Sequence, residues 1–175
     1  MKLLPNVNNG KLFEAIHYVI FSGGKRFRAF LTLQSAKLFD VPHGKALQAA
    51  SAVELIHAYS LVHDDLPSMD NDDLRRGKPT VHVKWDEATA ILVGDALQAF
   101  AYEVLCKKET HDNPTVRLHL VRELARAAGF HGMVLGQAKD LEAERLLKKL
   151  SLEEILELQR LKTGALFKWS VEAAG

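Results

Sequence analysis

The segment that most constrains this chain lies at residues 61–77 and reads LVHDDLPSMDNDDLRRG. It follows an apolar stretch and holds five aspartates and then two adjacent arginines: Asp64, Asp65, Asp70, Asp72 and Asp73, followed by Arg75 and Arg76. Carboxylates at this density repel one another unless a cation lies among them, and their oxygens suit hard ions such as Mg²⁺. Because arginine forks match phosphate oxygens, the two arginines indicate an anionic ligand that shares the metal. The segment therefore predicts a site for Mg²⁺ and a diphosphate.

Two other interpretations of this segment deserve comparison. An exposed acidic loop whose arginines pair with its aspartates remains an alternative on the residues alone. A calcium loop of the EF-hand type fails on spacing. Counted from Asp70, the fifth and sixth positions are Leu74 and Arg75, where such a loop needs a ligand and a glycine.

Composition narrows the class of protein. A length of 175 residues with 47% apolar content predicts one domain, residues 1–175, with a real core. A net charge of +1 does not favour nucleic acid. The single cysteine, Cys106, excludes an internal disulfide and a cysteine-based zinc site, fits a cytoplasmic location, and is expected in the core. We expect no membrane span, since no apolar run approaches about 18 residues, and no signal peptide.

The periodicity of apolar residues predicts a succession of helices and no strand. The expected helices cover residues 11–21, 25–39, 43–65, 84–107, 114–128, 129–147 and 152–171. Gly94 is expected to interrupt one of them and to permit close contact with another helix. Ser151 and Glu154 form the pattern of a capping box. We therefore expect an all-α helical bundle.

The expected helix at 43–65 is apolar nearly all round, which is typical of a buried helix. Glu54, His57, Ser60 and Asp64 nevertheless recur at helical spacing. At about 100° per residue, His57 and Asp64 fall within about 20° of the same face. A polar stripe on a buried helix needs partners or a water-filled cavity, so we expect this face to line a cleft. The alternative for His57 is a core histidine with its hydrogen bonds satisfied.

Two further basic elements could bind anions. Gly23 and Gly24 end the first helix, and a glycine pair before a helix start presents free backbone N–H groups beside Lys25 and Arg28. Solvated basic side chains are the alternative here. Later, Lys162 lies in an otherwise apolar segment, where it either serves a site or extends to water.

Together these segments resemble a known family. GGKRFR, HAYSLVHDDLPSMDNDDLRRGKPTVH, GDALQ, GQAKDLEAE and LKTGAL occur in the order and approximate spacing of bacterial short-chain trans-prenyltransferases. The chain is similar over nearly its whole length to the polyprenyl synthetase family, and within it to the farnesyl diphosphate synthases, also called geranyltranstransferases. The resemblance implies an all-helical isoprenoid synthase fold, a homodimer and Mg²⁺ as cofactor.

The resemblance also implies roles for particular residues. The allylic diphosphate and its Mg²⁺ ions would be bound by Asp64, Asp65, Asp70 and Arg75. Isopentenyl diphosphate would be bound by Lys25, Arg28, His57 and Arg76. The allylic leaving group and the developing cation would lie near Lys162 and Thr163, with Gln137 also in the substrate site. Product length would be set by Tyr59 and Ser60.

The implied reaction explains these residue types. Dimethylallyl or geranyl diphosphate would lose its diphosphate, the double bond of isopentenyl diphosphate would attack C1, and loss of a proton would give the next prenyl diphosphate. Neutralising the leaving diphosphate is the task of Mg²⁺, Arg75 and Lys162. The allylic cation requires an apolar cavity that excludes water. An aromatic residue at Tyr59, about 7.5 Å along the helix from Asp64, implies a C15 product, farnesyl diphosphate.

The chain departs from the family pattern in one respect. Family members are typically longer and carry a second DDxxD motif on a later helix, which these 175 residues do not contain. We therefore expect an incomplete bundle with little or no turnover by itself. The alternatives are a geranylgeranyl diphosphate synthase, or a non-catalytic helical subunit or fragment of a prenyl synthase. A terpene cyclase or longer-chain synthase is disfavoured by Tyr59 and by the GGKR element.

Overall fold

The computed structural model describes residues 10–147 and 149–174, which form two compact units. Unit 1 contains the described residues up to Arg26 together with Glu54–Val104, and unit 2 contains Phe27–Val53 together with the described residues from Leu105 onward. Helix α3 (His43–Asp64) continues through the boundary and contributes residues to both units. The organisation as a single domain stays a prediction.

Unit 1 is built around the second half of α3 and most of α5. Helix α5 spans Glu87–Cys106, and its residues up to Val104 belong to this unit. The other elements of unit 1 are α1 (Lys11–Phe21), β1 (Leu74–Arg75), β2 (Lys78–Pro79) and α4 (Val81–Lys84). Gly94 lies opposite His63, where a Cβ would stand 2.0 Å from the imidazole Nε2 atom. The expected close helix contact is therefore confirmed, whereas the expected interruption is wrong, because α5 continues through Gly94.

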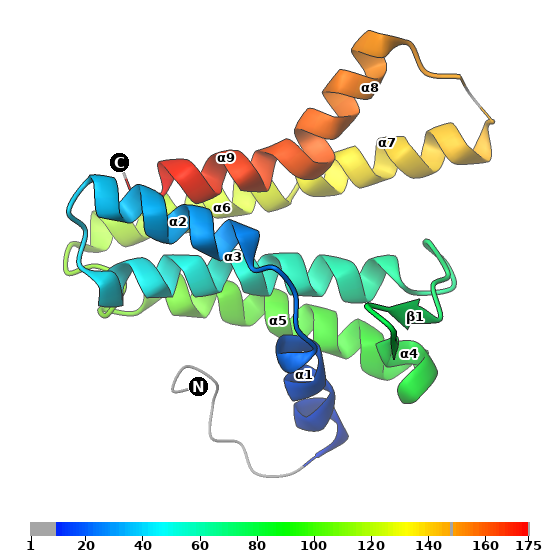
Figure 1. Cartoon of the computed structure of the whole chain (residues 1–175), viewed down its shortest axis with the longest axis horizontal. Coiled ribbons are helices and arrows are strands. Elements are labelled where there is room, and N and C mark those ends of the chain that lie inside the picture. Colours follow the sequence, from blue (N-terminus) through cyan, green and yellow to red (C-terminus); the bar gives the residue numbers. More distant parts are fainter. Residues whose placement is uncertain (1–9, 148, 175) are drawn as a thin grey trace. The chain divides into compact units, whose positions relative to one another are not determined.

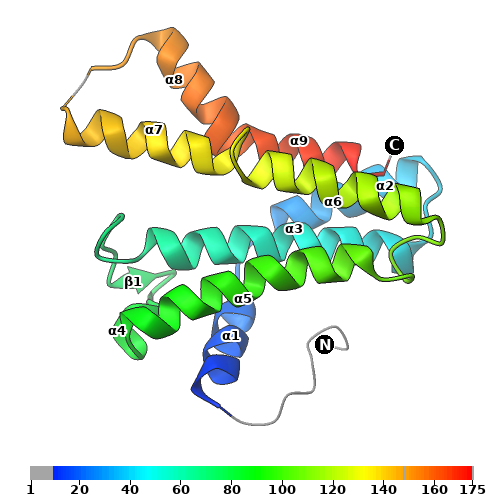
Figure 2. The ribbon, with the colours of Figure 1, turned by 180° about the vertical axis from the view of Figure 1, so that it is seen from behind.

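In the part of unit 2 that the structure describes, every secondary-structure element is a helix. Besides the first half of α3, its elements are α2 (Phe27–Leu38), α6 (Pro114–Ala128), α7 (Met133–Arg145), α8 (Leu152–Gln159), η1 (Arg160–Gly164) and α9 (Ala165–Glu172). Helix α9 packs against α2 and α6, and α7 packs against η1 (Figures 1 and 2). The expected single helix at 152–171 is thus divided by a π-helical turn, and Figure 1 shows α8 leaving the direction of α9 at that turn.

A two-stranded hairpin in unit 1 corrects the expectation of no strand. Leu74 pairs with Pro79 and Arg75 with Lys78, so only Arg76 and Gly77 remain in the turn. Both turn residues have positive φ, 56° and 75°, as a type I′ turn requires. The backbone at Arg76 is left-handed, a conformation that costs a non-glycine residue energy. The hairpin thus places Arg75 at the end of β1 and Arg76 in the tight turn that follows it.

Side-chain caps mark the starts of α5, α6 and α8. Asn113 accepts a hydrogen bond from the Thr115 amide at 2.9 Å at the start of α6. The predicted capping box of Ser151 and Glu154 is confirmed at the start of α8. Helix α5 begins at Glu87, later than expected, because Asp86 accepts hydrogen bonds from the amide and the hydroxyl of Thr89, each at 2.7 Å. A carboxylate before the first turn also complements the helix dipole.

Asp86 predicts a pH dependence of stability. Hydrogen bonds from Lys11 and Thr89 lower its pKa from 3.8 to about 2. Because the folded state binds this proton less tightly than the unfolded chain, the stabilisation is complete above the unfolded pKa and is lost as the pH falls through about 2. We expect Asp86→Asn to lower the urea midpoint near neutral pH, by an amount that shrinks on acidification. A difference that does not change with pH would contradict the assignment.

Two expectations from composition need correction or comment. Cys106 is exposed at the end of α5, so its assignment to the core is wrong.

Among the described residues, α5 is long and apolar enough to cross a membrane by length and composition, although no membrane span was expected. Half of its most apolar window is buried within the structure, and a core helix of a water-soluble protein meets the same criterion.

Candidate functional site

The loop after α3 folds back onto the end of that helix and gathers the aspartates. The Asp70 amide donates to the Asp64 carbonyl at 2.8 Å, and the Asp72 amide donates to the Asp65 carbonyl at 3.2 Å. These bonds satisfy carbonyl groups that the helix end would leave without partners. Pro67 lies just beyond the last helical residue, Asp64, where proline cannot continue the helix. Aspartates separated in sequence are therefore brought together by their own backbone.

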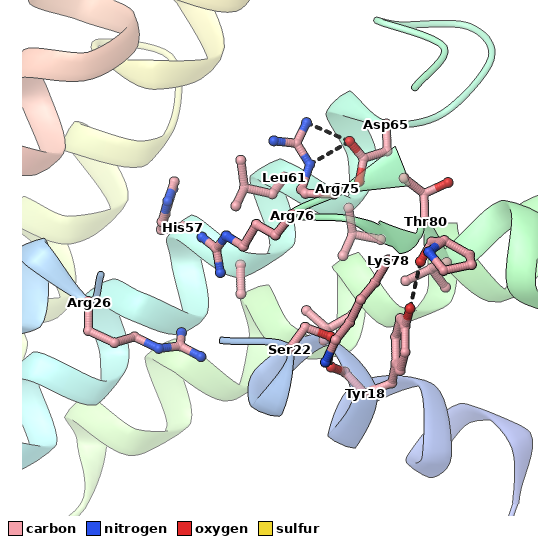
Figure 3. Close-up of a pocket in the computed structure, with 15 residues that line it drawn as sticks. Tyr18, Ser22, Arg26, His57, Leu61, Asp65, Arg75, Arg76, Lys78 and Thr80 are labelled. Carbon is pink, nitrogen blue, oxygen red and sulfur yellow. Dashed lines mark hydrogen bonds and ion pairs between the residues drawn. The ribbon is translucent and has the colours of Figure 1, made fainter. Parts of the chain in front are cut away.

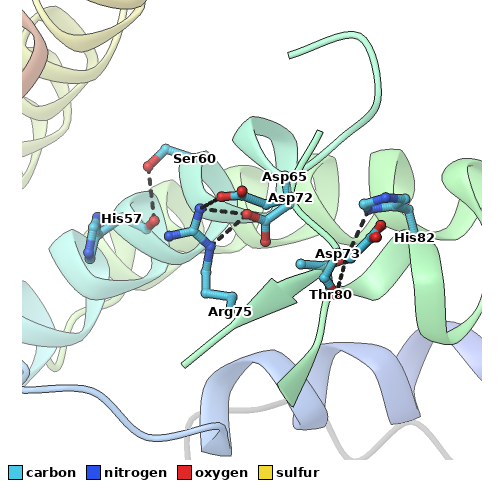
Figure 4. A network of polar contacts seen from close by, with 8 residues as sticks. All are labelled: His57, Ser60, Asp65, Asp72, Asp73, Arg75, Thr80 and His82. Atoms are coloured by element: carbon cyan, nitrogen blue, oxygen red, sulfur yellow. Dashed lines mark hydrogen bonds and ion pairs between the residues drawn. The ribbon is translucent and has the colours of Figure 1, made fainter. Parts of the chain in front are cut away.

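Asp65 and Arg75 form the central ion pair of this segment (Figure 4). Arg75 Nε lies 2.6 Å and Nη2 2.5 Å from Oδ1 of Asp65, and Nη2 also lies 3.4 Å from Asp72. The Asp65 side chain is only 5% exposed. Burial raises the pKa of the Asp65 carboxyl, and the hydrogen bond and charge of Arg75 oppose that shift in part. A buried carboxylate with a raised pKa and a cationic partner is typical of functional sites.

A small pocket of about 60 Å³ opens beside this pair in unit 1 (Figure 3). Its basic lining residues are Arg26, His57, Arg75, Arg76 and Lys78, and its one carboxylate is Asp65. Figure 3 shows the side chains of Arg26, His57 and Arg76 extending toward the same space from different elements. Because several cations meet at one pocket with one anion among them, the pocket is suited to a negatively charged ligand.

The hairpin is tied to α1 and to the loop that follows it. Tyr18 donates its hydroxyl proton to the Pro79 carbonyl at 2.7 Å. Arg76 donates to the Gly23 carbonyl, and its guanidinium lies where a Cβ on Gly24 would be, 2.3 Å from Nη1. Gly24 also has a φ of 123°, which side chains rarely adopt. Gly24 is therefore favoured by its backbone conformation, and a side chain there would also displace the Arg76 guanidinium.

The residues expected to bind isopentenyl diphosphate are only partly gathered. His57 and Arg76 line the pocket, and Lys25 is exposed outside its lining. Arg28 belongs to unit 2, where its guanidinium lies over the Phe167 ring at 4.6 Å. The assignment of all four residues to one ligand therefore stays a prediction. Arg26 and Lys78 also line the pocket, although no role was predicted for either. Both lie close in sequence to residues with predicted roles, since Arg26 follows Lys25 and Lys78 lies two residues after Arg76.

A second polar cluster lies in unit 2, where α7 meets η1. Lys162 Nζ contacts Asp140 Oδ2 at 2.5 Å, so the lysine has a carboxylate partner and does not simply extend to water. The Nε2 atom of Gln137 is buried without a hydrogen-bond partner among the described residues. Thr163 lies in the same π-helical turn. Because π-helical turns occur frequently at functional sites, this cluster supports the roles expected for Gln137, Lys162 and Thr163.

The two residues expected to set product length lie on α3. Tyr59 is 5% exposed, and burial raises the pKa of its hydroxyl. Its ring meets the His63 ring edge to face at 5.8 Å. Ser60 donates to the His57 carbonyl at 2.9 Å, so its hydroxyl is used within the helix. Tyr59 is thus a buried aromatic residue, and the role of both residues in product length stays a prediction.

The aspartates of the segment are the predicted metal ligands. Within residues 10–147 and 149–174, no three histidine, cysteine, aspartate or glutamate side chains are gathered closely enough to hold an ion. The donor chemistry nevertheless fits Mg²⁺, since the Asp64 and Asp70 backbones are hydrogen-bonded to each other and both side chains carry hard oxygens. Asp64, Asp65 and Asp70 remain the predicted ligands.

A mostly helical fold that carries aspartates and arginines at the end of a buried helix is the arrangement of the isoprenoid synthases. The crystal structure of an FPP/GFPP synthase from Zymomonas mobilis has the same class of fold, with a TM-score of 0.95 and 50% sequence identity. The match covers 99% of this chain and 63% of the Zymomonas mobilis chain.

The chain belongs to the polyprenyl synthetase family, whose sequence profile matches residues 9–175. It is 49% identical over 159 residues to the farnesyl diphosphate synthase of Haemophilus influenzae, covering 91% of this chain and 53% of the relative. It is 48% identical over 164 residues to the farnesyl diphosphate synthase of Geobacillus stearothermophilus, covering 93% and 54%. The chain thus spans about half the length of these curated relatives.

Proposed function

We propose that this chain binds an allylic diphosphate and isopentenyl diphosphate as part of a short-chain trans-prenyltransferase that makes farnesyl diphosphate. The observation that carries the proposal is the basic pocket of unit 1, where His57, Arg76 and Lys78 lie beside the buried Asp65–Arg75 pair. Its cations suit diphosphate oxygens, and bidentate arginine contacts would orient them. The names of the relatives support the substrates and the product.

In this proposal each residue has a limited task. Asp64, Asp65 and Asp70 would hold Mg²⁺, which when bound neutralises the leaving diphosphate. Arg75 would bind the allylic diphosphate while remaining on Asp65, and His57 and Arg76 would bind the second diphosphate. Lys162, held by Asp140, would add positive charge near the leaving group.

Tyr59 supports the C15 product, because a buried aromatic ring at this position would limit the length of a prenyl chain. We further propose a cytoplasmic location, supported by the single cysteine, and a homodimer, supported by the family resemblance.

Calorimetric binding tests the proposal without requiring turnover. The probe is a thiolodiphosphate analogue of dimethylallyl diphosphate, whose C–S bond resists ionisation, titrated with and without Mg²⁺. We expect Mg²⁺-dependent binding that Asp64→Asn and Asp70→Asn each weaken by at least the roughly 10–100-fold typical of losing an outer-sphere partner of a metal. Glu14→Gln, an exposed carboxylate on α1, is the matched control and should bind normally. Binding that is indifferent to EDTA and to both aspartates would refute the proposal.

A further inference from the structure

The loop at residues 22–26, SGGKR, is held within unit 1 at both ends, and we name it the glycine loop. At one end Arg76 of the hairpin donates to the Gly23 carbonyl, and its guanidinium lies against Gly24 where a Cβ would stand. At the other end lies Arg26, whose φ of 48° is left-handed. Such a conformation is unfavourable for a non-glycine residue, so other contacts must hold it.

The side chain of Arg26 supplies those contacts. Its Nη2 donates to the Ile20 carbonyl in the last turn of α1, and its Nη1 lies 3.3 Å from Oε2 of Glu54 on α3. The Glu54 side chain is 12% exposed and the Arg26 side chain 39% exposed, so this ion pair is partly shielded from water. Since the Arg26 guanidinium already has a carbonyl and a carboxylate as partners, its contacts serve the loop more than a ligand.

Glu54 connects the loop to the pocket. It precedes His57 by one helical turn, so the two side chains lie on the same face of α3. Arg26 and His57 both line the basic pocket, and Figure 3 shows them approaching it from the loop and from the helix. Lys25 lies in the loop between Gly24 and Arg26, where its position depends on how the loop is held.

We propose that Arg26 and Glu54 are a pair of positioning residues that hold the glycine loop, and Lys25 with it, against the face of α3 that carries His57. The inference rests on the proposed function, because the ligand that benefits is the diphosphate of isopentenyl diphosphate. Arg26 and Glu54 act through the loop and do not need to touch that ligand. Removing either member releases the loop, and removing the second then changes little more.

Hydrogen exchange of the unliganded chain tests the loop directly. We expect Arg26→Ala and Glu54→Ala each to raise amide exchange in residues 22–26 by about 10-fold, and the double variant to add little to either. Glu14→Ala, which removes an exposed carboxylate from α1, is the matched control and should leave the loop unchanged. Exchange in the core of α5 should also stay unchanged in all four variants, which separates loop release from general unfolding.

Calorimetry with isopentenyl diphosphate and with inorganic diphosphate gives the second readout. We expect about 10-fold weaker binding in both single variants and no additional loss in the double variant. Additive losses, or loop exchange that stays at the wild-type rate while wild-type binding is normal, would overturn the pairing. If the wild type binds neither diphosphate while amide exchange in the glycine loop still depends on Arg26 and Glu54, the proposed function and the positioning role both fail. Arg26 and Glu54 would then stabilise the loop without serving a ligand.

Discussion

Arg75→Ala is expected to destabilise the protein by about 2–3 kcal/mol, because it leaves the carboxylate of Asp65 buried without its partner. The Asp65 side chain is 5% exposed, and its Oδ1 lies 2.6 Å from Nε and 2.5 Å from Nη2 of Arg75. An Asp65→Leu, Arg75→Leu double variant should recover most of the loss, since a buried ion pair and an apolar pair of similar volume are often close in stability. Urea denaturation without ligand measures the effect.

A pH series adds a second test of Arg75→Ala. The pKa of Asp65 is raised by burial, so the folded state holds this proton more tightly than the unfolded chain, and charging the carboxyl lowers stability as the pH rises above 3.8. Without Arg75 that loss is larger, so the difference from wild type should grow with pH. Asp72→Asn is the control, since Asp72 is 53% exposed and 3.4 Å from Arg75, and it should change stability by less than about 1 kcal/mol. A constant difference across the pH range would contradict this account.

Gly136→Ala is expected to destabilise the protein by about 3 kcal/mol or more, because the added methyl group would meet backbone and not a flexible side chain. A Cβ there would lie 2.3 Å from the Lys162 amide nitrogen and 2.6 Å from its Cα. Helix α7 and the π-helical turn must then separate, and the contact between Asp140 and Lys162 would be lost with them. Thermal and urea unfolding measure the stability.

Gly44→Ala provides the matched control for Gly136→Ala in the same unit. Gly44 lies in the first turn of α3, and a Cβ there would meet nothing within 4 Å. The same chemical change should therefore be neutral or should stabilise the helix by up to about 1 kcal/mol. If both variants behaved alike, the close approach of α7 to Lys162 would not explain the need for glycine.

Local sequence chemistry predicts the helices well where an amphipathic pattern and a cap agree. The expected bounds of α1 and α6 are those observed, and the capping box of α8 is in place. The hairpin was missed because its strands have two residues each, too few for an alternating pattern. The available signal was Gly77, two residues before Pro79, since glycine in a two-residue turn favours a hairpin.

The π-helical turn could not be predicted from its own residues. The RLKTG segment has no feature that sets it apart from an ordinary helix, and the extra residue is accommodated where α7 packs against it through Gly136. The partner of Lys162 was likewise hidden, because Asp140 lies on a different helix. Side-chain chemistry in the acidic segment was easier to anticipate, because the interacting groups are neighbours in the chain.

Arg76 shows how conformational energy and chemistry compete at one position. The turn of the hairpin would form more easily with asparagine or glycine there, because both adopt left-handed backbone angles at less cost. Either would remove the guanidinium that reaches Gly23 and lines the pocket. Selection for stability alone would thus favour replacing this arginine, and the protein with the more stable hairpin would bind anions more weakly.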